Sequence, residues 1–159
     1  MARREYEFWT GPLGRRGQFA WAAESRDVGD LRRIHTEGRM TLFEASYTPA
    51  PGIELLEVGG HTPGQAIAAV ATGDGSAVIA SDAVHYYEEL ERDRPSAVVA
   101  DLRQMYRAFD QLRELASQAG TEIVAGHDPA VFSRFASRGG SGYPRHVIRI
   151  AALDRHTGQ

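Results

Sequence analysis

Three residues have types and positions that suit metal-ion chemistry: His61, Asp82 and His127. Each stands where a short apolar, strand-like run ends, and loops at strand ends are where layered α/β proteins gather ligands and catalytic groups. Neutral imidazole is a common zinc ligand, and the two oxygens of a carboxylate can bridge two metals about 3.5–4 Å apart. The pattern therefore indicates a metal site assembled from several strands, suited to activating a water and polarising a carbonyl or phosphoryl oxygen.

A plainer interpretation of these residues stays open at this point. A single histidine in a loop is more often a surface or hydrogen-bonding residue than a ligand. A single aspartate after a strand is more often a helix cap or a turn former. Residue type and spacing alone do not decide between the two interpretations.

The composition limits which ligands and partners are available. The 159 residues suit one compact domain, with 42% apolar and 25% charged residues and a net charge of −3. Because there are no cysteines, disulfides and thiolate chemistry are excluded and any metal must be held by histidine and carboxylate. We expect no nucleic-acid partner, no membrane span and no signal peptide, which makes the cytoplasm the expected location.

The apolar pattern predicts a helical segment followed by a layered sheet. Short apolar runs predict strands at 53–58, 66–71, 77–80, 121–125 and 147–152. Short helical stretches are expected at 2–9, 19–21, 28–34 and 130–136. A longer helix is expected to begin at Pro95-Ser96. Its buried side would be formed by a stripe of apolar residues at helical spacing: Val98, Leu102, Met105, Phe109, Leu112 and Leu115. Residues 47–52 read as a turn. Runs such as 78–80 are apolar throughout, which implies cover on both faces of the sheet.

Three short motifs together resemble a known family. They are GHTPG at 60–64, ASDA at 80–83 and AGHDP at 125–129. Their order and flanking residues are similar to those of the metallo-β-lactamase-fold hydrolases, and most of all to the N-acyl-homoserine lactonase branch. The resemblance covers about residues 45–135 and implies an α/β (α+β layered) fold, the C-terminal half of an αββα sandwich preceded by a helical segment.

The resemblance also implies roles for the site residues. His61 would ligate one metal, His127 the other, and Asp82 would bridge both, with Zn²⁺ the expected pair of ions, although the ligand types suit Mn and Fe as well. His85 and Tyr86 follow the bridging aspartate and are the candidates for hydrogen-bond donation to an oxyanion or leaving alkoxide. Tyr87 is expected to pack.

One family element is missing from the sequence. The HxHxDH motif, which supplies further ligands and the aspartate that positions the water, does not occur among the 159 residues. His61 and His127 with a bridging Asp82 give two protein ligands per metal, whereas catalytic zinc sites usually hold three. We therefore expect little or no lactonase activity from this chain alone.

The domain assignment follows from the same comparison. We expect one partial domain over 1–159: a helical lead-in at 1–40, a βα half-sandwich with the ligand loops at 41–136, and a tail at 137–159. A late start codon, a gene fragment or a split gene would explain a truncated chain. The expected partners are a small lactone or other ester, and either a second copy or an N-terminal half that covers the open sheet face. The expected activity is metal-dependent lactone opening; a glyoxalase II-like thioester hydrolase and an inactive protein that acts by association are the alternatives.

Overall fold

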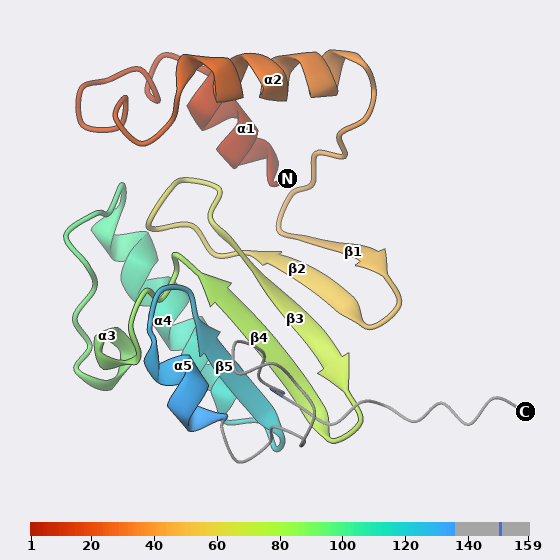
Figure 1. The fold of residues 1–159 in the computed structure, drawn as a ribbon, viewed down its shortest axis with the longest axis vertical. Helices are drawn as coiled ribbons and strands as arrows, with labels where there is room; N and C mark the ends of the chain where they lie inside the picture. Colours follow the sequence, from red (N-terminus) through yellow and green to blue (C-terminus); the bar gives the residue numbers. More distant parts are fainter. Residues whose placement is uncertain (136–149, 151–159) are drawn as a thin grey trace, which may run out of the picture.

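The computed structural model describes residues 1–135 and residue 150, and these residues build one mixed sheet with five helices around it (Figure 1). The strands follow one another across the sheet in the order β1-β2-β3-β4-β5. They are β1 (Ser46–Ala50), β2 (Ile53–Glu57), β3 (Ala66–Thr72), β4 (Gly75–Ser81) and β5 (Thr121–Ala125). The helices are α1 (Arg3–Thr10), α2 (Ser25–Thr36), α3 (Tyr87–Glu91), α4 (Leu102–Ala116) and α5 (Ala130–Arg134).

Strands β4 and β5 are the pair that matters for the site. All other neighbouring strands are antiparallel, but β4 and β5 are parallel, with Val78 opposite Ile123. A parallel pair needs a crossover connection, and here helices α3 and α4 supply it. Consequently β4 and β5 end at the same edge of the sheet, and the residues that follow them meet there (Figure 1).

The core lies between one face of this sheet and helix α4. Met105, Phe109 and Leu112 of the predicted stripe are fully buried against the sheet residues Val78 and Ala80. These residues recur at helical spacing along α4, so one side of the helix is apolar while the other carries charges. Packing of α4 on the sheet therefore fixes the ends of β4 and β5 relative to the helix.

The opposite face of the sheet is also apolar. The register places Ile79 beside Ala68 and Val124 on this face, and Ile79 is 37% exposed. The expected cover on this second face is therefore incomplete at Ile79.

The four strands expected between residues 53 and 125 are confirmed, while several neighbouring predictions are wrong. Of the predicted turn at 47–52, only Pro51 and Gly52 form a turn, because residues 46–50 form edge strand β1; Pro49 is tolerated there because an edge strand leaves one side unpaired. Residues 19–21 form turns. The charged run after Tyr86 contains α3, which we did not expect. The predicted strand at 147–152 and the tail from 137 lie outside the described residues, apart from residue 150.

Helix α4 begins later than the sequence suggested. Its N-cap is Asp101, whose carboxylate accepts a hydrogen bond from the backbone N–H of Gln104 at 3.0 Å. Pro95 and Ser96 lie outside the helix, and Val98 is exposed. The stripe was therefore correct from Met105 onward, but the start signal was wrong.

Helices α1 and α2 form a separate layer beyond one end of the sheet (Figure 1). The loop that joins β2 to β3 lies between this layer and the sheet. Its Gly64 N–H donates to the carboxylate of Glu5 in α1 at 3.0 Å, and a Cβ at Gly64 would lie 2.2 Å from the Glu5 backbone nitrogen. Only glycine allows this approach, so the HTPG loop is the docking point for the helical lead-in.

Candidate metal centre

Asp82 and His127 occupy the ends of the parallel strands β4 and β5. The segments that follow the two strands are tied by backbone hydrogen bonds: His127 donates to the His85 carbonyl at 2.9 Å, and Gly126 donates to the Val84 carbonyl at 2.8 Å. A Cβ at Gly126 would lie 2.5 Å from the Ser81 carbonyl oxygen. The glycine therefore permits the two chain segments to approach closely enough for their side chains to converge.

His61 is held over the same edge by the β2–β3 loop. Gly60 has φ +96° and lies against the backbone of Met105 in α4, where a Cβ would approach within 2.6 Å. Its carbonyl accepts hydrogen bonds from the N–H groups of Ala100 and Asp101, both at 3.0 Å. The His61 loop is thus fixed to the start of α4 rather than free in solvent.

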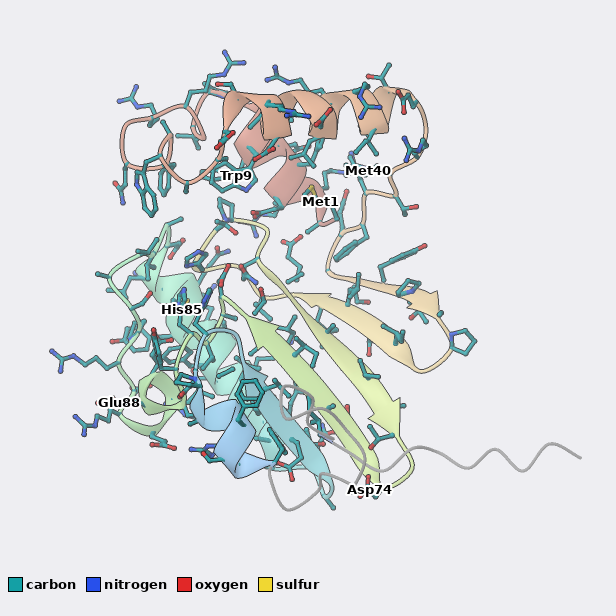
Figure 2. All side chains as sticks on the ribbon, in the orientation of Figure 1. Met1, Trp9, Met40, Asp74, His85 and Glu88 are labelled. Atoms are coloured by element: carbon teal, nitrogen blue, oxygen red, sulfur yellow. The ribbon has the colours of Figure 1, made fainter. Side chains whose placement is uncertain are left out.

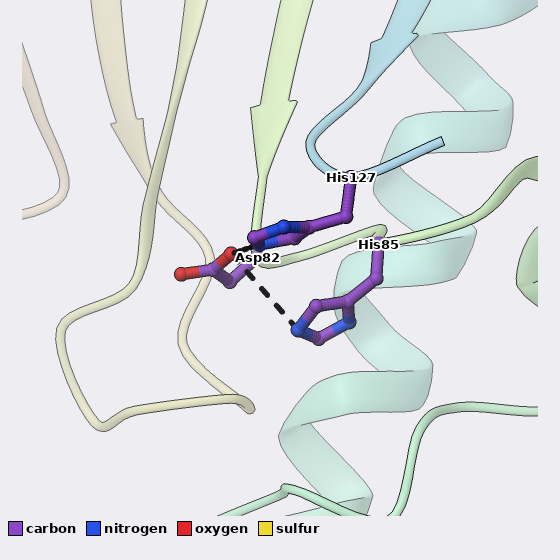
Figure 3. A group of neighbouring side chains, drawn as sticks. All are labelled: Asp82, His85 and His127. Carbon is purple, nitrogen blue, oxygen red and sulfur yellow. Dashed lines mark hydrogen bonds and ion pairs between the residues drawn. The ribbon is translucent and has the colours of Figure 1, made fainter. Parts of the chain in front are cut away.

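Asp82 lies at the centre of a cluster of imidazoles (Figure 3). Its Oδ1 lies 2.7 Å from Nε2 of His127 and 3.9 Å from Nε2 of His85. Its Oδ2 lies 3.9 Å from Nε2 of His61. The structure therefore brings together all three residues predicted as ligands, and it adds His85 to the group.

The two ring nitrogens of His61 have different neighbours, and these neighbours determine which nitrogen carries the proton. Nδ1 lies 2.9 Å from the Val98 carbonyl, which can only accept a hydrogen bond, so Nδ1 carries the proton. Nε2 then keeps its lone pair and faces Asp82. A second partner that orients an imidazole in this way is typical of metal-binding histidines.

The donor set fits a divalent metal ion. Asp82, His85 and His127 each offer one ligand atom, and these three atoms lie within 4.8 Å of one another. Neutral imidazoles and a carboxylate suit zinc and other first-row divalent metals. The assignment of His61 and His127 to separate metals stays a prediction. The catalytic role of Tyr86, a residue that is 50% exposed, also stays a prediction.

A cavity of about 360 Å³ opens beside His61 and Asp82. Its opposite wall comes from the helical lead-in, with apolar contributions from Met1, Trp9, Val28 and Leu31. Figure 2 labels two of these residues, Met1 and Trp9, on α1 and its N-terminal side. The sequence did not indicate this wall, because the wall depends on how α1 docks on the HTPG loop and how α2 packs against α1.

Two aromatic residues, Tyr87 and Phe109, pack in the core and do not line this cavity. Phe109 is fully buried in the core, and Tyr87 is buried with its hydroxyl donating to the Ile123 carbonyl at 3.0 Å. The guanidinium of Arg134 lies 3.8 Å from the centre of the Tyr87 ring. Burial raises the pKa of Tyr87, which keeps the phenol neutral. As expected for Tyr87, its role is packing beneath the site.

Comparison with solved structures identifies proteins with the same fold. An N-acyl homoserine lactone hydrolase, with the product N-hexanoyl-L-homoserine at its catalytic metal center, matches with TM-score 0.65 and 21% identity over 84% of this chain and 48% of its own. A probable metal-dependent hydrolase from Staphylococcus aureus gives TM-score 0.61 and 20% identity over 77% of this chain and 41% of its own. The fold is that of the metallo-β-lactamase hydrolases. The predicted resemblance and fold class are thereby confirmed.

The match covers only part of those proteins. The dizinc quorum-quenching lactonase AidC aligns with 81% of this chain but 47% of its own length, at TM-score 0.59 and 16% identity. The chain thus spans about half the length of the solved structures it matches, as a C-terminal portion would. No profile of a known protein family matches the sequence, and no curated protein matches it. In residues 1–135, no helix is long and apolar enough to cross a membrane.

Proposed function

We propose that this chain carries the metal-binding part of a hydrolase that opens lactone rings, with N-acyl-homoserine lactones as the substrate class. The observation that carries the proposal is the position of Asp82: three imidazoles lie near its carboxylate, and Asp82 and His61 line a cavity that has apolar residues on its opposite wall. Solved structures of this fold include one lactone hydrolase with product bound at its catalytic metal center and a dizinc lactonase in complex with a product, which supports the choice of substrate.

The proposal gives each part of the site a task. Asp82 and the imidazoles of His61 and His127 hold the metal, and His85 lies beside them as a candidate hydrogen-bond donor. A bound divalent ion lowers the pKa of a water molecule and polarises the carbonyl to be attacked. The wall formed by Met1, Val28 and Leu31 excludes water from one side and accommodates the apolar portion of the substrate. Tyr86 is the proposed donor to the leaving alkoxide.

Turnover by this chain alone should be weak. Because the sequence lacks HxHxDH, it offers no aspartate of that motif to position the attacking water. Positioning of the reacting groups supplies a large share of catalysis, so its loss lowers the rate even when a metal and a substrate are bound. The expected activity is therefore slow and metal-dependent.

The test measures opening of the N-hexanoyl-L-homoserine lactone ring by the full chain. The reaction is monitored through the proton that it releases, with and without added Zn²⁺. We expect slow hydrolysis that requires the metal and is abolished by Asp82→Asn. Asp74→Asn, in the turn between β3 and β4, is the matched control and should leave the rate unchanged. Hydrolysis that persists in Asp82→Asn would contradict the proposal.

A non-enzymatic role by association is the second candidate, and the absence of HxHxDH is the observation that favours it. In that case the lactone would not be opened at any metal concentration, although the metal cluster could still bind its ion. Zero turnover with metal bound would therefore select this candidate.

A further inference from the structure

A buried carboxylate lies directly behind His85. Glu89, in helix α3, is only 7% exposed. Its Oε2 accepts a hydrogen bond from the backbone N–H of His85 at 2.9 Å, and its Oε1 lies 3.4 Å from Nδ1 of the same residue. Burial of a carboxylate is costly unless it is paired, so the position of Glu89 requires an explanation.

The geometry determines which nitrogen of His85 carries the proton. Nδ1 is buried and has no hydrogen-bond partner other than this nearby carboxylate oxygen, which can only accept. A proton on Nδ1 satisfies both groups at once. Nε2 is then left with its lone pair, and it points toward Oδ1 of Asp82.

We infer that His85 is a metal ligand and that Glu89 is the residue that positions it. Asp82, His85 and His127 then form a two-histidine, one-carboxylate site that this chain can complete alone. The inference deepens the proposed function, since it concerns the same metal centre, but it assigns His85 to metal binding rather than to hydrogen-bond donation. It also changes the ligand count from two protein ligands per metal to three for one metal.

The distances between the ligand atoms agree with this assignment. In a tetrahedral zinc site with bonds of about 2.0–2.1 Å, the ligand atoms lie about 3.4 Å apart. The Asp82–His127 and Asp82–His85 distances, 2.7 and 3.9 Å, bracket that value. All three ligand atoms lie within 4.8 Å of one another, so binding of one ion requires them to move closer together.

The packing of the rings supports a preformed site. The His85 ring stacks on the His127 ring at 5.2 Å between centroids and meets the His61 ring edge-on at 5.0 Å. The His85 side chain is 14% exposed, and its backbone carbonyl accepts from the His127 N–H. The ring is therefore held in place from behind by Glu89 and from the side by its neighbours, which reduces the ordering cost of metal binding.

The test measures metal binding rather than activity. The full chain is titrated with Zn²⁺ by calorimetry and with Co²⁺ by visible absorption. We expect a tight first equivalent in the wild type, a loss of at least tenfold in affinity in His85→Ala, and a loss of about 10–100-fold in Glu89→Gln, the range typical of partners that orient a ligating histidine. Circular dichroism checks that each variant is folded.

Two controls separate positioning from a general effect of substitution. Glu88→Gln changes the adjacent carboxylate on α3, whose side chain is 64% exposed and paired with Arg92, and it should leave the affinity unchanged. His35→Gln removes an imidazole that contacts Tyr6 in the helical lead-in and should also have no effect. Figure 2 labels both His85 and Glu88.

A measurement on the wild-type protein does not depend on any variant folding. The side-chain ¹⁵N resonances of His85 should show a protonated Nδ1 before metal is added and a shift of Nε2 when one equivalent of Zn²⁺ is bound. An Nε2 resonance that does not move while one equivalent binds would overturn the inference, as would unchanged affinity in Glu89→Gln. Either result leaves lactone hydrolysis to be judged by its own assay, so the two proposals can fail separately.

Discussion

At the scale of single residues, the site depends on backbone positions that ordinary side chains do not favour. Ser81 adopts φ +49° immediately before Asp82, in the left-handed region that costs a non-glycine residue roughly 1–2 kcal/mol. Strain of this kind is typical of functional sites, where the surrounding structure imposes it. The carbonyl oxygen of Ser81 lies close to Gly126, which directly follows the neighbouring strand β5.

Substitution of Gly126 should damage the site without touching a ligand. In Gly126→Ala the new Cβ would meet the Ser81 carbonyl oxygen at 2.5 Å, so the two strand exits must separate. We expect a loss of about 1–3 kcal/mol in the free energy of unfolding and weaker Zn²⁺ binding, measured by urea denaturation and calorimetry. Gly29→Ala is the control, because its Cβ would meet open space in helix α2. Equal Zn²⁺ affinity in both variants would contradict the account of Gly126.

Residue patterns predicted part of the cluster and missed the rest. His61, Asp82 and His127 could be predicted because each ends a strand-like run. The place of His85 beside them, and the pairing with Glu89, could not be assigned because α3 was not expected within the charged run. The spacing of four residues between His85 and Glu89 is the signal that was available, but His85 precedes α3, which begins at Tyr87, so a helical pattern would not have paired them.

At the scale of elements, helix α4 is the support on which the His61 loop rests. The N-cap region of α4 supplies the N–H groups that hold the Gly60 carbonyl, and Met105 supplies the surface against which Gly60 packs. Fraying of the first turn of α4 would therefore loosen His61. Periodicity predicted the buried face of this helix, but its start depends on Asp101, whose capping role competes with the Pro95-Ser96 signal.

Removal of the N-cap tests this coupling. In Asp101→Ala the Gln104 N–H loses its acceptor, and we expect a loss of about 0.5–2 kcal/mol in the free energy of unfolding. Thermal or urea denaturation measures the change. Asp101→Asn keeps a capping oxygen and should retain most of the stability. Equal stability of the wild type and both variants would contradict a stabilising role of the Asp101 cap.

At the scale of the whole molecule, one face of the sheet is covered by α4 and the other exposes apolar residues. Ile79 is 37% exposed at the centre of the second face, where it neighbours Ala68 and Val124. The sequence predicted apolar character on both faces, but it could not predict that Ile79 would be left exposed, because exposure depends on how the helices pack on the sheet. The partition into 1–40, 41–136 and 137–159 likewise stays a prediction.

We predict that this exposed face drives association of the chain. Ile79→Lys places a charge at its centre and should lower the sedimentation coefficient observed at high protein concentration, because burying an unpaired charge opposes contact between apolar faces. Ala71→Lys, at an exposed position on the other face, is the control and should sediment like the wild type. Identical sedimentation of all three proteins at every concentration would contradict the prediction.

Asp82, His85 and His127 are proposed to form a metal site within this chain. The most direct measurement is a crystal structure of the Zn²⁺-loaded protein with anomalous data collected at the zinc edge. We expect an anomalous peak within bonding distance of the Asp82 carboxylate and of Nε2 of both His85 and His127. A crystal that contains zinc elsewhere, with the Asp82–His127 hydrogen bond still intact, would contradict it.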